Sequence, residues 1–524
     1  MRLRFDELRT GRCDFVVIGG GATGVGVAID AAARGYSVAL FEQSDFGKGT
    51  SSRSTKLIHG GVRYLQQGNI PLVMEALKER GMLRANAPHL VHDLPFVVPN
   101  YQWWEAPFYG IGMRVYDALA GRYGFGDSRN LSWEETVARI PTIETRGLRG
   151  GVLYYDGQFD DARLLIHMAM TAATYGAVLL NYARVTGLEK DASGFVTGVR
   201  VHDLETGEEA GLGARVVVNC TGVFADAVRR LDEPDAPALI RPSQGVHIVL
   251  DRSFLPGDAA IMVPHTDDGR VLFAIPWHDR VLIGTTDTPV DDVALEPRPL
   301  DGEVRFLIEH AIRYLTRDPA ITDIRSVFTG LRPLVDQGDT DTAAVSREHS
   351  VLVSHSGLVT VAGGKWTTYR KMAEDTVDHA ATLAGLEPRP CPTRELPLYG
   401  AHTEGPADTA ARQRIDRGPF AVYGSDAPAL LDLIAADPAL GEPLHPELSV
   451  CAAQVLWAVR HEMARTVDDM LARRTRALLF DVRAAIAIAP RIAEIMANEL
   501  GRDEGWRRAQ VDAFSDVAAN YLPG

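Results

Sequence analysis

The chain has 524 residues, of which 46% are hydrophobic and 23% are charged, as in ordinary soluble globular proteins. Asp and Glu number 69 against 54 Lys and Arg, and the resulting net charge of −15 argues against a nucleic-acid backbone as partner. This length predicts roughly two to four domains. No apolar run is long enough to predict a membrane-spanning helix, and the N-terminus lacks the pattern of a secretory signal.

The four cysteines, Cys13, Cys220, Cys391 and Cys451, lie far apart and lack CxxC spacing. This spacing argues against a zinc site and fits a reducing compartment. We therefore expect no metal, and a cytoplasmic protein.

The N-terminal part of the chain has the pattern of a dinucleotide-binding unit. The apolar run Phe15–Ile18 predicts a buried parallel strand, Gly19–Gly24 has the spacing GxGxxG, and the small residues of Ala22–Arg34 predict a helix. A second apolar strand, Ser37–Phe41, ends at Glu42. The alternative, a glycine-rich loop of purely structural use, does not explain why strand, helix and acid follow in register.

Each residue of this motif has a physical task. Gly19 permits the tight turn, Gly21 lets the backbone approach a pyrophosphate, and Gly24 lets helix and strand pack closely. The helix N-terminus adds N–H donors and the positive end of a dipole. Glu42 can bind ribose hydroxyls and would repel a 2′-phosphate, which disfavours NADP.

The segments that follow Glu42 predict that the same site continues. Gly47–Ser52 is dense in backbone and hydroxyl donors, which suit a second phosphate or the edge of a flavin, although a surface loop has the same composition. Lys56–Tyr64 then places a base, a guanidinium and a phenol beside glycines, as a small anionic ligand requires.

Two later strands also end in glycine turns. Ala214–Asn219 leads into Thr221–Gly222, and Leu358–Ala362 leads into Gly363–Gly364, where a helix begins. Together with the first motif, these turns are what a discontinuous FAD-binding domain needs, because each brings the backbone close to the cofactor.

The middle of the chain changes pattern. Short apolar segments between residues 241 and 290 are separated by turn residues, which predicts an antiparallel sheet in a second domain inserted into the first. Ser326–Leu334 then returns to the site. Helices are predicted over Pro71–Asn86, Met113–Leu119 and Glu303–Leu315.

An aromatic cluster precedes the helix predicted at Met113. We interpret Trp103, Trp104, Phe108 and Tyr109 as ordinary packing rather than as a ligand platform. The exposed face of that helix could instead contact a membrane or a partner.

The last part of the chain is predicted to be helical. Ala452–Ala472 has apolar residues at helical spacing, and Ile486–Leu500 and Glu504–Tyr521 complete a cap. Arg473–Arg476 follows the first of these helices, where cations suit the dipole. We interpret it as a solvated helix end, with contact to an anionic membrane as the alternative.

Three segments resemble one known family. They are SSRSTKLIHGGVRY (Ser51–Tyr64), GLRPL (Gly330–Leu334) and GGKWTTYRK (Gly363–Lys371), and by them the chain resembles the FAD-dependent (respiratory) glycerol-3-phosphate dehydrogenases over nearly its whole length. The resemblance implies an α/β flavoprotein of the D-amino-acid-oxidase and glutathione-reductase type. Its parts would be a discontinuous Rossmann-like FAD-binding domain (12–94, 151–235 and 325–390), an inserted antiparallel-sheet substrate-binding domain (95–150 and 236–324) and a C-terminal helical cap (391–524).

The resemblance also implies the reaction. Members of the family oxidise sn-glycerol 3-phosphate to dihydroxyacetone phosphate by hydride transfer to FAD and pass the electrons to a membrane quinone. We therefore expect a peripheral contact with the inner face of the cytoplasmic membrane, and a homodimer is compatible with the family. The sequence has no calcium-binding DxDxDG loop, so calcium control is not expected.

The resemblance assigns roles to individual positions. The expected substrate-binding residues are Arg63, Tyr64, His247, Arg332, Arg347 and Lys365. The expected catalytic residues are His59, Arg63, His247, Arg332 and Lys365. The expected FAD-binding residues are Gly19, Gly20, Gly21, Thr23, Gly24, Phe41, Glu42, Thr50, Ser51, Ser52, Lys56, Leu57, His59, Thr221, Gly222, Gly364, Lys365, Thr367 and Thr368.

The chemistry of the reaction agrees with these residue types. Oxidation of a secondary alcohol needs a proton acceptor, and a neutral imidazole from His59 or His247 suits that role; the sequence leaves the choice between them open. A phosphate dianion needs several cations, which Arg63, Arg332 and Lys365 can supply. For Arg332 the structural alternative is a salt bridge to a carboxylate at a domain interface.

Four other functions remain as alternatives. An oxidase of the same family would pass electrons to oxygen and make hydrogen peroxide, but the insertion common in such oxidases is not obvious here. A flavin-dependent amine or amino-acid oxidase would lack the paired motifs of Ser51–Tyr64 and Gly363–Lys371. A non-catalytic FAD-binding protein would not explain the clustered cations, and an NAD-linked dehydrogenase would not use the later glycine turns.

Overall fold

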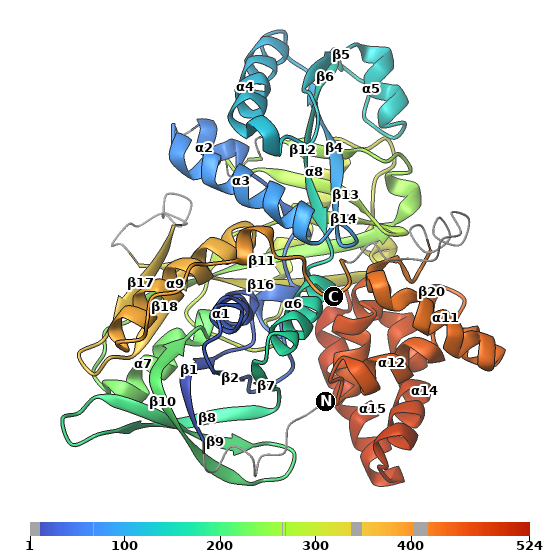
Figure 1. Cartoon of the computed structure of the whole chain (residues 1–524). Helices are drawn as coiled ribbons and strands as arrows, with labels where there is room; N and C mark the ends of the chain where they lie inside the picture. Colours follow the sequence, from blue (N-terminus) through green and yellow to red (C-terminus); the bar gives the residue numbers. More distant parts are fainter. Residues whose placement is uncertain are drawn as a thin grey trace.

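The computed structural model describes residues 11–66, 68–264, 266–267, 269–336, 348–401 and 418–523. Two β-sheets and a group of C-terminal helices make up this part of the chain (Figure 1). The first sheet lies at the lower left of the view, the second sheet above it, and the C-terminal helices at the lower right.

The first sheet contains the predicted dinucleotide-binding strands. Its strand order is β17-β18-β10-β1-β2-β7, and β8 and β9 extend it from β10. Neighbours β18, β10, β1, β2 and β7 run parallel, and their apolar runs, such as Phe15–Ile18 and Val216–Asn219, are buried. The bounds are β1 (Arg12–Ile18), β2 (Val38–Phe41), β7 (Val178–Leu180), β8 (Ala183–Lys190), β9 (Val196–Asp203), β10 (Glu209–Asn219), β17 (His349–Val353) and β18 (Val359–Gly363).

Three helices pack together against this sheet. They are α1 (Ala22–Ala33), α6 (Asp161–Thr174) and α9 (Tyr369–Leu383). Small residues let α1 approach α9 closely, because a Cβ on Gly26 would lie 2.9 Å from the Tyr369 ring. A shorter helix, α7 (Ala225–Asp232), follows β10. The predicted strand–helix–strand unit is confirmed, with α1 ending one residue before the predicted Arg34.

The second sheet is larger than the predicted inserted domain. Its order is β15-β11-β14-β13-β12-β4-β6-β3, with β16 on β11 and β5 on β6. The bounds are β3 (Leu57–Ile58), β4 (Val91–Asn100), β5 (Arg129–Leu131), β6 (Gly150–Phe159), β11 (Ile240–Asp251), β12 (Ala260–Val263), β13 (Leu272–Trp277), β14 (Arg280–Gly284), β15 (Thr288–Pro289) and β16 (Ser326–Val335). The expected antiparallel hairpins are confirmed, for example between β13 and β14.

The predicted domain boundaries do not coincide with this sheet. Both β6 and β16 were placed in FAD-binding segments, yet β6 pairs with β4 over its whole length and β16 pairs with β11 over ten residues. The physical reason is that a buried strand has the same apolar sequence pattern in either sheet. Only its hydrogen-bonded neighbours show to which sheet it belongs.

Five helices flank the second sheet. They are α2 (Val62–Gln66), α3 (Ile70–Asn86), α4 (Glu105–Ala120), α5 (Trp133–Arg139) and α8 (Asp301–Ile312). Helix α4 is longer than predicted and buries Tyr109 and Met113, but Trp103 is 76% exposed and Phe108 is 50% exposed. The interpretation of this aromatic cluster as ordinary packing is therefore wrong for its outer members.

The C-terminal region contains α11 (Ala427–Ala436), β19 (Pro443–His445), β20 (Leu448–Cys451), α12 (Ala452–His461), α13 (Ala477–Phe480), α14 (Val482–Leu500) and α15 (Glu504–Ala518). The single helix predicted over Ala452–Ala472 is wrong. Helix α12 ends at His461, and a π-helical turn, Asp469–Arg474, follows after a break. The break lets Glu462 turn inward, where its carboxylate binds the buried Arg163 guanidinium at 2.7 Å.

The interpretation of Arg473–Arg476 as a solvated helix end is also wrong. Arg473 and Arg474 are buried and both bind Asp45, which follows β2 in the first sheet. Arg476 binds Asp160 at 2.8 Å. These cations therefore fasten the C-terminal region to the predicted FAD-binding segments. Among the helices of the described ranges, none is long and apolar enough to cross a membrane.

Candidate active site

Three glycine turns meet at one edge of the first sheet. Strands β1, β10 and β18 are parallel neighbours, so the turns that follow them lie side by side. These turns line a common cavity of about 540 Å³, which we call the first cavity. The predicted convergence of Gly19, Thr221–Gly222 and Gly363–Gly364 is thus confirmed.

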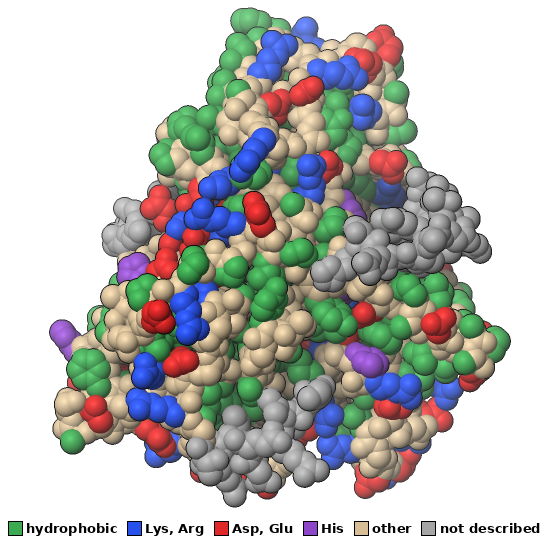
Figure 2. All heavy atoms as spheres, in the orientation of Figure 1, with side chains coloured by type: hydrophobic (Ala, Val, Ile, Leu, Met, Phe, Trp, Pro, Cys, Tyr) green, Lys and Arg blue, Asp and Glu red, His purple; other side chains and the backbone are tan. Residues whose placement is uncertain are grey.

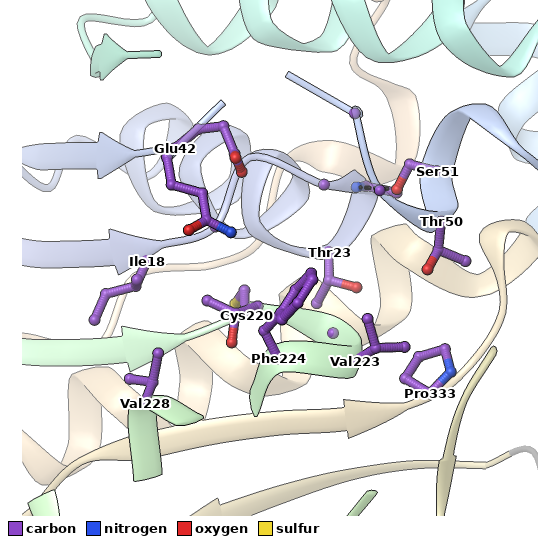
Figure 3. Close-up of a pocket in the computed structure, with 18 of the residues that line it drawn as sticks. Ile18, Thr23, Glu42, Thr50, Ser51, Cys220, Val223, Phe224, Val228 and Pro333 are labelled. Carbon is purple, nitrogen blue, oxygen red and sulfur yellow. Dashed lines mark hydrogen bonds between the residues drawn. The ribbon is translucent and has the colours of Figure 1, made fainter. Parts of the chain in front are cut away.

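The first cavity is elongated. Figure 3 shows Glu42 and Val228 toward one end and Thr50 and Pro333 toward the other, with Thr23 between them. Thr23 belongs to the first turn of α1, so the positive end of this helix faces the middle of the cavity. That arrangement suits a ligand with a nucleoside at one end and a diphosphate at its centre.

The glycines are required by contact distances. Gly19 has φ +107°, and a Cβ there would lie 2.7 Å from the carbonyl oxygen of Cys220. A Cβ on Gly24 would lie 2.0 Å from the carbonyl oxygen of Gly19, so only glycine lets α1 begin this close to β1. The sequence-based explanation of Gly24 as a packing residue agrees with this geometry.

Glu42 is held by the backbone at one end of the cavity. Its Oε2 accepts from the N–H of Gly20 at 2.7 Å, and Oε1 accepts from the N–H of Ser44 at 2.8 Å. Burial raises the pKa of Glu42, and the two N–H donors oppose that rise. Each carboxylate oxygen keeps a second lone pair, so a ribose hydroxyl can still be bound.

The loop after β2 is fixed by three parts of the molecule. Ser51 Oγ accepts from the N–H of Ala22 at the start of α1, and Ser51 carbonyl oxygen accepts from the Trp366 indole at 2.9 Å. Thr50 Oγ1 donates to the carbonyl oxygen of Leu331 in β16 at 2.6 Å. The alternative of a surface loop without a binding role is therefore not supported for this segment.

Most predicted FAD-binding residues surround the first cavity. Those that line it are Gly19, Gly21, Thr23, Phe41, Glu42, Thr50, Ser51, Thr221, Gly222, Gly364 and Lys365. Those outside its lining are Gly20, Gly24, Ser52, Lys56, Leu57, His59, Thr367 and Thr368, of which Leu57 and His59 line a second cavity.

Lys56 is a predicted FAD-binding residue whose side chain points away from the first cavity's lining and has partners within the protein. Its side chain is fully buried, and its ammonium donates to both carboxylate oxygens of Asp161 and to the carbonyl oxygen of Ser52. An ammonium in these three contacts supports the loop from within the protein rather than facing a ligand.

The second cavity, of about 490 Å³, lies between α2, α4 and the second sheet. Its polar end is lined by His59, Arg270, Thr285, Asp287 and Arg332. Its remaining walls are largely apolar and include Val62, Leu65, Phe108, Ile111, Val115, Val271 and Phe273.

Arg332 is oriented by neighbouring strand ends. Its guanidinium lies 3.2 Å from an Asp287 carboxylate oxygen, and it donates to the Thr285 hydroxyl and to the carbonyl oxygens of Gln244 and Thr286. Asp287 also accepts from the Ser243 hydroxyl. Arg332 is thus in a salt bridge and at a cavity wall at once, so both sequence-based interpretations apply.

The two candidate histidines occupy different positions. His59 lines the second cavity directly. His247 is 3% exposed, stacks on Phe328 and contacts the Thr55 hydroxyl through Nε2 at 2.9 Å. Burial, followed by the charges of Arg332 and Lys56, lowers the pKa of His247 well below its usual value, so its imidazole is neutral.

Lys365 lies between the two cavities. It lines the first cavity, and its ammonium lies 3.8 Å from the ring centre of Tyr64, which lines the second. Arg63 belongs to α2 with its side chain outside the described part, and Arg347 lies outside the described residues.

The polar residues of the second cavity that the sequence analysis missed include Thr55, Arg270, Thr285 and Asp287. A signal was present, since Thr285–Asp287 are polar residues at the end of a buried strand. That signal could not be interpreted without knowing that β14 ends beside β11 and β16.

The fold and the two adjoining cavities define the class of protein, a flavin-dependent oxidoreductase. The first cavity fits FAD because it offers a helix start for the diphosphate, Glu42 for a ribose and Lys365 beside Tyr64 of the second cavity. In agreement, residues 14–370 match the FAD dependent oxidoreductase family, and residues 391–507 match the C-terminal domain of alpha-glycerophosphate oxidase.

Comparison with individual proteins gives the narrower family. The chain is 40% identical to the mitochondrial glycerol-3-phosphate dehydrogenase of Homo sapiens over 96% of this chain and 72% of that protein, and equally identical to the Arabidopsis thaliana protein over 97% and 86%. The X-ray structure of glycerol-3-phosphate dehydrogenase from Bacillus halodurans complexed with FAD matches with a TM-score of 0.80 and 29% identity, over 98% of this chain and 96% of that one. The chain belongs to the FAD-dependent glycerol-3-phosphate dehydrogenases.

Proposed function

We propose that this enzyme oxidises sn-glycerol 3-phosphate to dihydroxyacetone phosphate with FAD as the hydride acceptor. The supporting observation is the polar end of the second cavity, which Arg332, His59 and Tyr64 line beside Lys365. A small polar space with fixed cations, adjoining a flavin-sized cavity, suits the phosphate ester of a short polyol.

Arg332 and Lys365 contribute to substrate binding in different ways. Arg332 presents a planar guanidinium already oriented by Asp287 and Thr285, so it can bind phosphate or alkoxide oxygens with little loss of freedom. Lys365 adds a point charge above the ring of Tyr64, which lines the second cavity. Their positive field also favours the negative charge that develops during oxidation.

The substrate hydroxyl loses its proton to His59 in this proposal, because His59 lines the cavity itself. His247 does not line the cavity itself. Its neutral imidazole orients the hydroxyl of Thr55, and Thr55 lines the cavity that holds the substrate. When bound, FAD would supply the hydride acceptor for the carbon that bears this hydroxyl.

We also propose that a membrane quinone takes up the electrons. The apolar walls of the second cavity continue to α4, whose outer side chains Phe108, Ile111 and Val115, together with the preceding Trp104, are 42–64% exposed. Figure 2 shows hydrophobic side chains along the upper left edge of the molecule, over α2 and α4. An exposed apolar helix beside the mouth of an apolar cavity supports a peripheral contact with the cytoplasmic membrane and entry of a lipid-soluble acceptor there.

Anaerobic mixing tests the first proposal. Glycerol 3-phosphate is expected to bleach the flavin absorbance of the holoenzyme, whereas glycerol, which lacks the phosphate, is expected to do so far more slowly. Unchanged flavin absorbance with glycerol 3-phosphate would contradict the substrate.

The acceptor is tested on the reduced enzyme. Addition of a quinone is expected to restore the flavin absorbance at least as fast as the enzyme turns over. Air alone is expected to restore it slowly. Stoichiometric hydrogen peroxide at the rate of turnover would identify the enzyme as an oxidase instead.

A further inference from the structure

A segment that follows the last hairpin of the second sheet reaches across to the first cavity. Residues 290–300 connect β15 to α8 without helix or strand, and we call them the strap. Its ends are anchored beside the second sheet, where the Val290 N–H donates to the carbonyl oxygen of Pro242 and the Arg298 carbonyl accepts from Gln244. Between these anchors, Leu295 lines the first cavity.

Glu296 fastens the middle of the strap to the loop after β2. Its Oε2 lies 2.6 Å from an Arg53 guanidinium nitrogen, and its Oε1 lies 3.0 Å from the Lys48 ammonium. Lys48 lines the first cavity, in the same loop that Thr50 and Ser51 fix to β16 and α1. One carboxylate thus joins the strap to the wall of the cofactor cavity.

The C-terminal region takes part in the same cluster. The Lys48 ammonium also binds Asp468 at 2.6 Å, and the Tyr521 hydroxyl donates to Glu296 at 3.4 Å. Burial lowers the pKa of Lys48, but the charges of Asp468 and Glu296 outweigh it and the net shift is upward, so the cation is retained. The charges of Lys48 and Arg53 are balanced by carboxylates from two separate parts of the chain.

We propose that Glu296 is the clasp of this strap and that the closed strap retains FAD in the first cavity. A ligand as long as FAD extends along a cavity whose wall includes Leu295, so its departure requires the strap to move away. The strap has no backbone ladder, and the ion pairs of Glu296 hold its middle to the cavity wall. Glu296 is a positioning residue in this inference, since it acts through Lys48 and Leu295.

Because the strap is held by the ion pairs of Glu296 with Lys48 and Arg53, the rate of FAD release should depend on salt. The Glu296, Lys48 and Arg53 side chains are 19%, 13% and 6% exposed, so ions can partly screen the pairs. The rate at which the wild-type holoenzyme loses FAD should therefore rise several-fold between about 0.05 and 0.5 M NaCl, a range over which the screening length shortens markedly.

The test measures FAD dissociation from purified holoenzyme by recovery of free-flavin fluorescence, with the melting temperature of the apoprotein as a second readout. Glu296→Gln is expected to speed release about tenfold or more and to lose most of the salt dependence. Leu295→Ala leaves the ion pairs intact and is expected to speed release while keeping the salt dependence. Asp292→Asn, an exposed carboxylate of the same strap, is the matched control and should match the wild type.

Release rates within twofold of the wild type in both the Glu296 and Leu295 variants would overturn the proposal, as would unchanged salt dependence in Glu296→Gln. If Glu296→Gln does not fold, the Leu295 variant decides alone. The inference rests on FAD binding and not on the substrate or the acceptor, so its failure leaves the proposed function standing.

Discussion

The two cavities of this enzyme are built in different ways. The first is formed by backbone turns at the ends of parallel strands, and its glycines are necessary because a Cβ would collide with neighbouring backbone. The second is formed by side chains from distant segments, such as His59, Asp287 and Arg332. The first cavity is therefore sensitive to small changes in shape, and the second to changes in charge.

The largest effect is expected on flavin content, from a substitution at a glycine turn of the first cavity. Gly24→Ala would place a Cβ 2.0 Å from the carbonyl oxygen of Gly19 and push α1 away from β1. The purified variant is expected to contain almost no flavin by absorbance. Gly302→Ala, at a helical position with open space around the added methyl group, serves as control. Full flavin content in Gly24→Ala would contradict this account of the first cavity.

A charge change in the second cavity should separate binding of FAD from turnover. Arg332→Ala is expected to keep its flavin but to lose about 100- to 1,000-fold in kcat/KM for glycerol 3-phosphate, since a pair of charge-assisted contacts contributes roughly 3–4 kcal/mol. Arg317→Ala, at an exposed position, is the control. Steady-state kinetics that show near-normal kcat/KM for Arg332→Ala would remove Arg332 from the site.

Breaking the ion pairs between the first sheet and the C-terminal region should lower the free energy of unfolding. Arg474→Ala removes a fully buried guanidinium from Asp45, and breaking such a pair costs about 3–5 kcal/mol. Chemical denaturation of the apoprotein would measure this loss. The exposed Arg508→Ala should change the free energy of unfolding by less than about 0.5 kcal/mol, and an equal loss in both variants would contradict the network.

The ion pairs of Asp45 at the same junction predict that the stability of the fold depends on pH. Burial raises the pKa of Asp45, but Arg474 and Arg473 outweigh burial and hold it below its usual value. A carboxyl group with a lowered native pKa stabilises the fold fully above its unfolded pKa of about 3.9, and this contribution is lost as the pH falls through the native pKa. Melting temperatures should therefore fall more steeply below about pH 4 in the wild type than in Asp45→Asn.

The smallest effect concerns the outer surface near the second cavity. Trp103→Ser removes an exposed ring next to α4 and is expected to weaken binding to phospholipid vesicles several-fold, with unchanged dye-linked turnover. Trp133→Ser, on α5, is the matched control. Sedimentation with vesicles is the measurement, and equal binding by both variants would place the membrane contact elsewhere.

Prediction from sequence was most successful where local pattern and function coincide. The unit from Phe15 to Glu42 was recognisable because strand, glycine turn, helix and acid follow one another within a short segment. Prediction failed where a pattern has two structural meanings. Ala452–Ala472 has apolar residues at helical spacing, yet the helix ends at His461, and Glu462 just beyond it pairs with the distant Arg163.

Charged residues were the least predictable from the sequence. Lys56 lies in a motif of the family and was assigned to FAD, but its ammonium is fully buried with Asp161. Arg473 and Arg474 were interpreted as solvated, and they proved to be buried partners of Asp45. The partner of a charge is set by segments hundreds of positions away, and no local pattern contains that information.

The sequence by itself determined that FAD is bound and which family the chain resembles, because glycine spacing and short motifs are local properties of the chain. The tertiary structure decided which strands belong to which sheet, how Asp287 orients Arg332 and how Glu296 reaches Lys48. Those features depend on long-range pairing, where strand order and buried charge balance select one arrangement among many that the same residues would allow.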